Sequence, residues 1–401
     1  MKASDEIAMS NSALSSRSYL IYLIGSTVSL HGLWIYRVAL GWFTWQLTGS
    51  EFWVGLIAFT QFAPAVVFGP LFGVLADRFD RRKASLLINS LSVINMCLLG
   101  VLAWLGKVDI AVLVAQSLVQ GSLDGAHTPI RMTLVPNLVS RNQLQSAIAN
   151  ASISFNVSRF VGPAIAGFVI AHYGVSAAFV INGLSYLAII AAVAVVELRP
   201  APQKTQTGSN VWAEMVEGVH YTMAHRTIRS LLFTVLVASV CGRGALEMMP
   251  AFADSIYERG AAGLATLTAA IGIGAIASGL VLSRSTAWLS GRVVRLSVVV
   301  AGFFIVALGA NTAFWAALPI VVALGVILSL CGVGSQILIQ TLVEEGVRGR
   351  VSSLWGMIAF GGTAFGSLIV GSAAAAIGLQ TTVVIAGLLC AALALLEPIK
   401  Q

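Results

Sequence analysis

The chain has 401 residues, of which 58% are hydrophobic and only 10% are charged, well below the roughly 25% usual in soluble domains. This composition excludes a soluble globular protein, and the long continuous apolar runs predict membrane-spanning helices instead of the alternating strands of a barrel. The formal net charge of +7 could suit a nucleic-acid partner, but the distribution of the basic residues explains it without one.

Twelve apolar segments are long enough to cross a bilayer, which requires about 20 residues of helix. In chain order they lie near residues 18–47, 53–76, 84–106, 109–135, 145–172, 176–197, 230–253, 263–283, 293–311, 313–341, 351–376 and 379–396. Residues 1–16 are polar and have no cleavage site, so we expect no cleavable signal peptide. The four cysteines fall inside the segments and are expected to be core residues, neither a disulfide framework nor a metal set.

The basic residues predict the orientation of the spans. With a cytoplasmic N-terminus, 18 of the 23 lysines and arginines fall at cytoplasmic ends and loops, and only Lys107 and Arg259 fall outside. Such an excess on one side requires an even number of spans. We therefore expect a multi-pass protein of the cytoplasmic (inner) membrane, with both termini cytoplasmic and the lipid bilayer, not nucleic acid, around it.

The longest polar stretch, near 198–229, divides the chain into halves. It begins with two prolines, Pro200 and Pro202, which end a helix. Apolar residues at helical spacing follow and predict a short amphipathic helix on the cytoplasmic face, with a plain solvated connector as the alternative. We expect a six-helix bundle over 1–197, a linker over 198–229 and a second six-helix bundle over 230–401, which makes an all-α membrane protein of two pseudo-symmetric bundles.

Three short motifs recur in both halves at nearly one offset. Residues 73–78 are echoed 206 positions later by 279–284, and residues 133–135 are echoed 208 positions later by 341–343. The third motif is a set of glycines, repeated at an offset near 204: Gly162, Gly167 and Gly174, then Gly366, Gly371 and Gly378. Two six-span halves related in this way are one plan of secondary transporters, whose substrate site lies between the halves near mid-membrane.

The loop between the second and third spans, residues 73–83, reads Gly-Val-Leu-Ala-Asp-Arg-Phe-Asp-Arg-Arg-Lys. It resembles the signature loop of the major facilitator superfamily, although Asp80 stands where that family usually has glycine. The resemblance implies a cytoplasmic gate in which Asp77 lies near a helix N-terminus, with Arg131 as its partner. A plain positively charged inner loop is the alternative. The gate residues expected here are Gly73, Asp77, Arg78, Arg81, Arg82 and Arg131.

The fifth span contains Gly162, Pro163 and Gly167, which resemble the fifth-helix motif of the superfamily's exporters. We add these three residues to the gate, with ordinary small-residue helix packing as the alternative. Further motifs in residues 32–50, 156–163, 217–221 and 348–351 are similar to those of the enterobactin-exporter-like branch. That resemblance implies export of siderophores, macrolides or other amphipathic molecules at the expense of the proton gradient.

Five charged side chains fall inside predicted spans, where a charge costs at least about 2.5–3.5 kcal/mol and usually faces a partner or a cavity. They are Arg37, Asp124, Arg159, Arg243 and Glu247. Arg243 and Glu247 are one helical turn apart and can pair, with a purely structural ion pair as the alternative. For Asp124 we expect a partner on another helix, first Arg159 and then Arg37.

The family resemblance implies that spans 1, 4, 7 and 10 line the cavity, with span 5 beside them. The cavity residues expected on these spans are His31, Trp34, Tyr36, His127, Asn156, Met248 and Gln336. Trp42 and Trp45 belong either to an aromatic cavity or to the membrane interface. Proton-coupled members often have an arginine four residues before the glycine of span 4. Here that glycine is Gly121 and the residue four positions earlier is Ser117, so Arg159 or Arg37 would have to take the role of that arginine.

These features predict a secondary active transporter that exports a siderophore or drug-like amphipathic molecule by alternating access and proton antiport. An uptake carrier or a lipid-type flippase of the same fold is the alternative. Nucleophile-elbow, zinc-protease and Walker A motifs do not occur, and the histidines lack ligand spacing. We therefore expect no enzyme activity, no catalytic or metal site and no cofactor, and a monomer.

Overall fold

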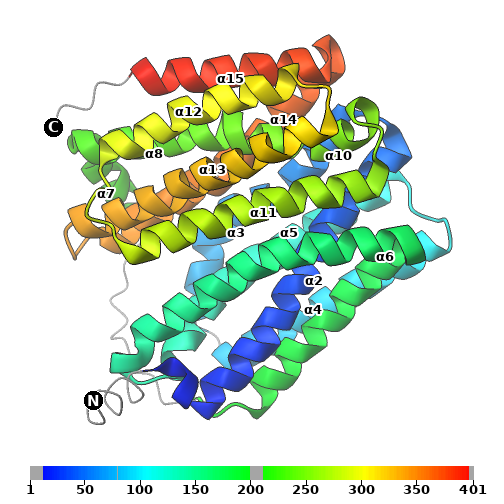
Figure 1. The fold of residues 1–401 in the computed structure, drawn as a ribbon. Coiled ribbons are helices and arrows are strands. Elements are labelled where there is room, and N and C mark those ends of the chain that lie inside the picture. The colour runs from blue at the N-terminus through cyan, green and yellow to red at the C-terminus, as the bar shows by residue number, and fades with distance from the viewer. Residues whose placement is uncertain (1–11, 79, 199–210, 397–401) are drawn as a thin grey trace, which may run out of the picture. The chain divides into compact units, whose positions relative to one another are not determined.

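The structure is a computed structural model that describes residues 12–78, 80–198 and 211–396, and these residues are almost entirely helical (Figure 1). The side chains of 69–79, 128, 132, 133, 141 and 211–215 lie outside what it describes. The longer helices are α2 (Arg17–Thr48), α3 (Glu51–Arg78), α4 (Arg81–Trp104), α5 (Ile110–Leu134), α6 (Leu144–Val195), α7 (Val211–Ala224), α8 (Arg226–Val237), α11 (Gly260–Arg284), α12 (Gly291–Ala310), α13 (Phe314–Leu342), α14 (Arg348–Ile377) and α15 (Leu379–Leu396). The short segments are η1 (Ala13–Ser15), η2 (Val135–Asn137), η3 (Arg141–Gln143), η4 (Ala238–Arg243), α9 (Gly244–Leu246), α10 (Met249–Ala251) and η5 (Phe252–Ile256).

Twelve spans emerge from these elements. Within the described ranges, ten helical segments are long and apolar enough to cross a membrane. One of them, α6, contains two spans, because Gly174 interrupts it with non-helical backbone angles. Helix α5 supplies the remaining span: its 25 residues suffice in length, although Gln116, Gln120 and Asp124 make it more polar than its neighbours. The predicted fold class, an all-α membrane protein of twelve spans, is confirmed.

The turn between the two halves of α6 is repeated between α14 and α15. Gly174 has a φ of 78° and Gly378 a φ of 91°. Residues with a side chain rarely adopt such angles, whereas glycine does so at little cost. The two positions are 204 residues apart, so the repeat noticed in the sequence extends to the backbone conformation of corresponding turns.

The helices form two compact units that do not follow chain order. The first contains residues 1–40 and 67–207, and the second contains 41–66 and 208–401. In the first unit α4 packs against both α6 and α5. In the second, α12 lies between α15 and α13, and α13 packs against α11 (Figure 1). The domain limits predicted from the sequence, at 197 and 230, stay a prediction.

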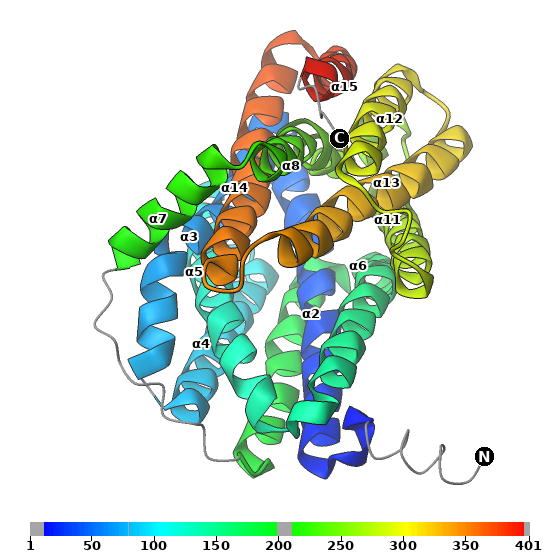
Figure 2. The same cartoon turned by 90° about the vertical axis from the view of Figure 1, so that its left-hand side faces the viewer.

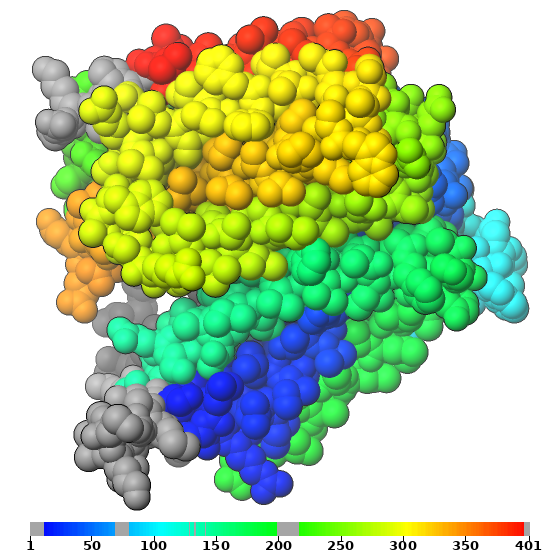
Figure 3. All heavy atoms as spheres, viewed as in Figure 1, coloured from blue at the N-terminus to red at the C-terminus, as the bar shows by residue number. Residues whose placement is uncertain are grey.

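The outer surface of the second unit is apolar. Side chains of α12 and α15 form a continuous surface on the face shown in Figure 3. Phe303 of α12 is 63% exposed and Leu395 of α15 is 60% exposed. Exposed apolar side chains of this size suit contact with acyl chains, which agrees with helices that cross a bilayer.

The end of α2 and the start of α3 pack within the second unit. The indole Nε1 of Trp45 donates a hydrogen bond to Oδ2 of Asp254 in η5, at 2.8 Å. Gly55 of α3 lies against Gly371 of α14, where an added Cβ on Gly371 would stand 3.0 Å from the Cα of Gly55. Helices approach this closely only through small residues. Spans 1 and 2 therefore each belong to the first unit in one part of their length and to the second unit in the other.

We predict that Gly174→Ala and Gly378→Ala each lower the thermal unfolding temperature of the purified protein in detergent. A left-handed backbone costs an alanine about 1–2 kcal/mol. Gly356 is the matched control, because it lies inside α14 with no atom within 4 Å of an added Cβ, so alanine there is neutral or stabilising. Equal shifts for all three variants would contradict the assignment of the turns.

Candidate functional site

Asp124 lies on α5 within a cluster of hydrogen-bonding side chains. One turn earlier, Gln120 donates from Nε2 to Oδ1 of Asp124 and to the hydroxyl of Tyr186, both at 3.0 Å. Tyr186 of α6 also forms a side-chain hydrogen bond with the Asp124 carboxyl. Asn95 of α4 donates to Oε1 of Gln120 at 3.3 Å. Residues of three helices thus hold one carboxyl group in position.

A guanidinium group from a fourth helix acts on this carboxyl group. Arg37 of α2 interacts electrostatically with Asp124. Both charged groups also interact electrostatically with the side chain of Tyr36. Tyr36 itself packs edge-on against Phe179 of α6, with ring centroids 6.1 Å apart. Arg37 was the second partner expected for Asp124, after Arg159, and the choice between the two stays a prediction.

Two arginines share the indole ring of Trp34. The Cζ atom of Arg37 lies 5.0 Å from the ring centroid, and that of Arg159 lies 5.5 Å from it. Both distances are in the range of cation–π attraction. Phe155 packs edge-on against the same indole at 5.8 Å, and Gly162 leaves room for Trp34 where α2 crosses α6. The result is a cationic and aromatic cluster on α2 and the first half of α6.

His31 continues this cluster toward the start of α2. Its Nδ1 lies 2.7 Å from the carbonyl oxygen of Thr27 and 3.0 Å from Oγ of Ser158. A carbonyl oxygen only accepts hydrogen bonds, so the neutral ring carries its proton on Nδ1 and keeps the lone pair on Nε2. Oγ1 of Thr27 and Oγ of Ser154 lie 2.6 Å apart, one turn further on. A polar strip therefore runs along the contact between α2 and α6.

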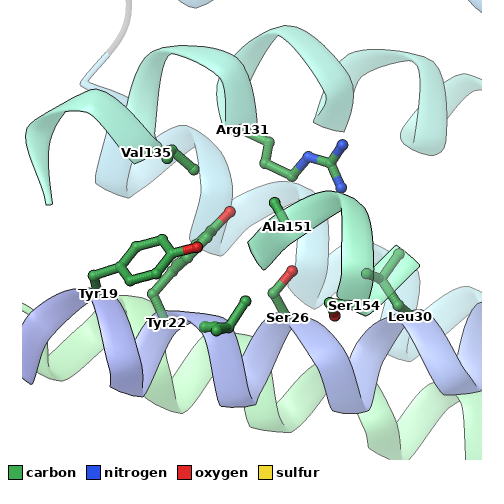
Figure 4. A pocket seen from close by; sticks show the side chains of 9 residues that line it. Tyr19, Tyr22, Ser26, Leu30, Arg131, Val135, Ala151 and Ser154 are labelled. Atoms are coloured by element: carbon green, nitrogen blue, oxygen red, sulfur yellow. The ribbon is translucent and has the colours of Figure 1, made fainter. Parts of the chain in front are cut away.

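The strip ends at a small cavity of about 30 Å³. It is lined by Tyr19, Tyr22, Leu23, Ser26, Leu30, Arg131, Val135, Ala151 and Ser154 (Figure 4). Arg131 approaches it from α5, and the two tyrosines approach from α2. A space of this size holds only one or a few water molecules. It is therefore too small for an amphipathic cargo molecule and is suited to hydrating the polar strip.

The second unit places Arg243 between two spans. Arg243 ends the π-helical segment η4, and its Nη2 would lie 2.6 Å from a Cβ added to Gly332 of α13. Its charge interacts with Glu247, the partner expected from the sequence. Met248 is fully buried beside them, and Gln336 is half-buried on α13. Their part in a substrate cavity stays a prediction.

Two of the charged residues in the signature loop stabilise helix ends. Asp80 is the N-cap of α4, and its carboxylate accepts a hydrogen bond from the backbone N–H of Lys83 at 2.8 Å. Arg82 donates to the carbonyl oxygens of Ala194, at 3.4 Å, and of Val196, where α6 ends. A cation is favourable at a helix C-terminus. Asp80, which departs from the family pattern, thus starts a helix.

Other gate residues are only partly described. The side chains of Gly73, Asp77 and Arg78 lie outside the described residues, so the contact between Asp77 and Arg131 stays a prediction. Arg81 is half-buried in the first turn of α4, and Gly162, Pro163 and Gly167 are buried in α6. Of the remaining cavity residues, His127 is half-buried on α5, and Asn156 donates to the carbonyl oxygen of Ser152 on its own helix at 2.9 Å.

Two sequence motifs far apart in the chain meet at α7. Glu217 and Arg350 form an ion pair with 2.6 Å between Oε1 and Nη1, and Gly218 lies against Arg350. Figure 2 shows α7 beside α14. The helix lies in the interval where the sequence predicts an amphipathic helix, and this contact anchors it to the start of span 11.

The hydrogen-bond network around Asp124 was missed by sequence reasoning. Gln120, Asn95 and Tyr186 were not among the predicted site residues. The available signal was the spacing of Gln116, Gln120 and Asp124, which recur every four residues and therefore share one face of α5. Amides on such a face indicate a hydrogen-bonded site as clearly as a second charge would.

The sequence matches the family model for transmembrane secretion effectors (MFS_3) over residues 9–400. The chain belongs to this family. It is therefore a multi-pass membrane transporter of the major facilitator superfamily and not an enzyme, as the sequence predicted.

Characterised relatives include the multidrug efflux pump Tap of Mycolicibacterium fortuitum, which is 26% identical over 90% of this chain and 90% of that protein. The enterobactin exporter EntS of Salmonella typhi is 26% identical over 82% of this chain and 77% of that protein. The staphyloferrin A transporter of Staphylococcus aureus is 23% identical, but the match covers only 60% of this chain and 59% of that protein. Efflux and siderophore transport are thus the activities named among the relatives.

Solved structures support the fold alone. The nucleoside transporter NupG superposes with a TM-score of 0.69 at 14% identity, over 94% of this chain and 98% of that chain. A bacterial homologue of the lysosomal transporter Spinster, inward-facing and occupied, gives 0.74 at 15% identity, over 95% and 97% of the two chains. At this identity the likeness carries no information about cargo.

We predict that Gln120→Leu lowers the free energy of unfolding by about 1–3 kcal/mol, because it leaves the buried Asn95 and Tyr186 without a shared partner. Gln116→Leu is the control, since within the described residues the buried Oε1 of Gln116 has no hydrogen-bond partner to lose. The measurement is chemical unfolding in detergent micelles. If both variants lose the same stability, the network around Asp124 does not hold the helices together.

Proposed function

We propose that this transporter exports an amphipathic small molecule by alternating access. The observation that carries the proposal is the cluster on α2, α5 and α6, in which one carboxyl group and two guanidinium groups lie with an indole ring inside a membrane-spanning unit. Charges at this depth are costly unless they face a partner or a wet cavity. The names of the relatives, an efflux pump and a siderophore exporter, favour export over uptake by a carrier of the same fold.

Alternating access requires contacts that can be exchanged. Residues 41–66 pack in the second unit, while the rest of α2 and α3 packs in the first. Opening of the site toward the outer face would break the contacts of Trp45 and Gly55 described above. Span 7 is suited to bending, because the π-helical segments η4 and η5 lie on either side of Pro250.

We further propose that proton antiport supplies the energy, with Asp124 as the proton-carrying group. Antiport needs a group that is ionised while cargo leaves and protonated while the carrier returns. Asp124 is the one acidic residue between Asp109 and Glu197 in the sequence. Its neighbour Tyr186 can donate or accept a hydrogen bond, so the cluster can accommodate either protonation state. Arg37 or Arg159 would take the part of the arginine that Ser117 replaces.

The proposed setting is the inner membrane, with both termini cytoplasmic and the protein acting as a monomer. The excess of basic residues on one side supports this orientation. A monomer suffices because one chain contains both repeated halves. Everted membrane vesicles that accumulate erythromycin or enterobactin, and lose it on addition of an uncoupler, would support export; exit from the vesicles would instead indicate uptake into cells.

We predict that Asp124→Asn abolishes gradient-driven accumulation in these vesicles, because the amide has the shape of the carboxyl group but cannot carry a proton. Immunoblotting of the membrane fraction checks that the variant is present in normal amount. Transport at the wild-type rate by the asparagine variant would remove Asp124 from the coupling mechanism.

We predict that Trp45→Phe weakens closure of the outer ends, since it removes a hydrogen bond to a carboxylate worth about 1.5–3 kcal/mol. Spin labels at Ser50 and Arg259 should then show a larger population at long distance in pulsed electron resonance. Trp42→Phe is the matched control, because only ring carbons of Trp42 face Gly260, where an added Cβ would stand 3.7 Å from Cη2. Indistinguishable distance distributions for the two variants would argue against a role for the Trp45–Asp254 hydrogen bond in closure.

A further inference from the structure

One face of α5 carries polar side chains from Asp124 to the end that the proposed orientation places in the cytoplasm. Asp124, His127 and Arg131 follow one another at intervals of three and four residues, so they share this face. With a rise of about 1.5 Å per residue, Arg131 lies about 10 Å beyond Asp124 along the helix axis. His127 lies between them and interacts electrostatically with Arg131, which lines the small cavity.

The polar strip between α2 and α6 connects the same two places. Ser154 of α6 lines the cavity (Figure 4). One turn further along that helix, Oγ of Ser158 lies 3.0 Å from Nδ1 of His31. The strip then leads along α2 to Arg37, whose charge acts on Asp124. Polar side chains of three helices therefore connect the carboxyl cluster to the cavity, which is large enough to hold water.

His127 has ring nitrogens that are available for proton transfer. Within the described residues it forms no hydrogen bond, and its side chain is half-buried. By contrast, Nδ1 of His31 lies within hydrogen-bond distance of both Thr27 and Ser158. An imidazole ring accepts a proton on one nitrogen and releases a proton from the other. His127 can therefore pass on a proton without losing a structural hydrogen bond.

The surroundings of His127 contain few groups that could take the proton instead. The charged and titratable side chains on its own helix and on the neighbouring α2 and α6 are Asp124, Arg131, His31, Arg37, Tyr19, Tyr22, Arg159 and Tyr186. Helix α4 has no acidic, basic or histidine residue between Lys83 and Trp104. Arginine is already protonated and tyrosine is a far weaker base than imidazole. The histidines are therefore the side chains that can accept a proton from Asp124 and pass it on.

We propose that His127 relays the coupling proton from Asp124 toward the cytoplasm. After the empty, protonated carrier has returned, the Asp124 carboxyl group gives its proton to one ring nitrogen of His127, directly or through one water molecule. Asp124 becomes a carboxylate and His127 an imidazolium. The other ring nitrogen then gives its proton to water in the cavity, and rotation of the neutral ring restores the starting tautomer.

This inference rests on the proposed antiport and deepens it, because it names the group through which the proton leaves. One turn of helix separates the side chains of Asp124 and His127 by about 5–6 Å between Cβ atoms. That separation suits a direct hydrogen bond or a single bridging water. The relay also leaves Asp124 ionised before cargo binds, as the proposed cycle requires.

His127→Gln tests the relay, because glutamine is polar and of similar size but does not carry a proton. In everted vesicles we expect gradient-driven accumulation of erythromycin or enterobactin to fall by at least about tenfold, since each cycle must release a proton. Exchange of labelled for unlabelled cargo without a gradient should stay within about twofold, because the loaded carrier moves with Asp124 ionised. His172→Gln, at an exposed position of α6, is the matched control and should change neither rate.

Proton release by the purified full-length protein in detergent gives a second measurement that needs no cargo. The protein is mixed rapidly from about pH 5 to about pH 8, and the indicator pyranine reports the released protons. The component that is missing in Asp124→Asn belongs to Asp124. We expect His127→Gln to keep the amplitude of this component and to slow it by at least about tenfold, because the carboxyl group still loses its proton but without the relay.

Unchanged accumulation by His127→Gln, or proton release at the wild-type rate, would overturn the relay and leave the antiport standing. Loss of accumulation and exchange together would also overturn it, since His127 would then serve cargo binding or folding. If His127→Gln is absent from the membrane fraction, His127→Asn takes its place in both assays. Wild-type behaviour of Asp124→Asn in both assays would instead refute the proposed antiport, and the relay with it.

Discussion

Charged groups at the depth of a bilayer must be solvated by protein atoms, and the rest of the structure depends on this requirement. Asp124 receives this solvation from Gln120, Tyr186 and the charge of Arg37, which come from three different helices. The cost is that α5 must be more polar than an ordinary span, and the packing of α4 against it and the hydrogen bond from Gln120 to Tyr186 of α6 compensate. A helix of this kind is stable only inside a bundle, so the site and the first unit support each other.

The same helix that contributes Arg37 to the site also belongs to both units. Arg37, which acts on Asp124, lies one helical turn before Gly41, where α2 passes from the first unit to the second. The Trp45–Asp254 hydrogen bond follows one further turn along the helix. In the alternating access proposed above, a change of tilt of this continuous helix would connect a change in charge at Asp124 to the contacts of Trp45.

The sequence predicted the spans, the repeat that relates Gly174 to Gly378, and the charged residues within the membrane, because these follow from hydropathy and from comparison of the two halves. It did not predict the role of Gln120, because only charged residues within the spans were considered, although the four-residue spacing of Gln116, Gln120 and Asp124 places these side chains on one face of the helix. It left Trp45 between cavity and membrane interface, because the partner Asp254 lies 209 residues away. Such long-range pairs depend on how helices pack, which composition and periodicity do not determine.

The motifs that resemble those of the family have two different roles in this structure. At the helix ends, Asp80 and Arg82 stabilise helix termini, and the Glu217–Arg350 pair anchors α7. Within the membrane, the motifs of residues 32–50 and 156–163 contain Trp34, Arg37 and Arg159. Relatives with named cargoes as different as enterobactin and macrolides are similar to this chain, so likeness to the family cannot by itself identify the cargo. Cargo selection must therefore be sought in the chemistry of individual side chains.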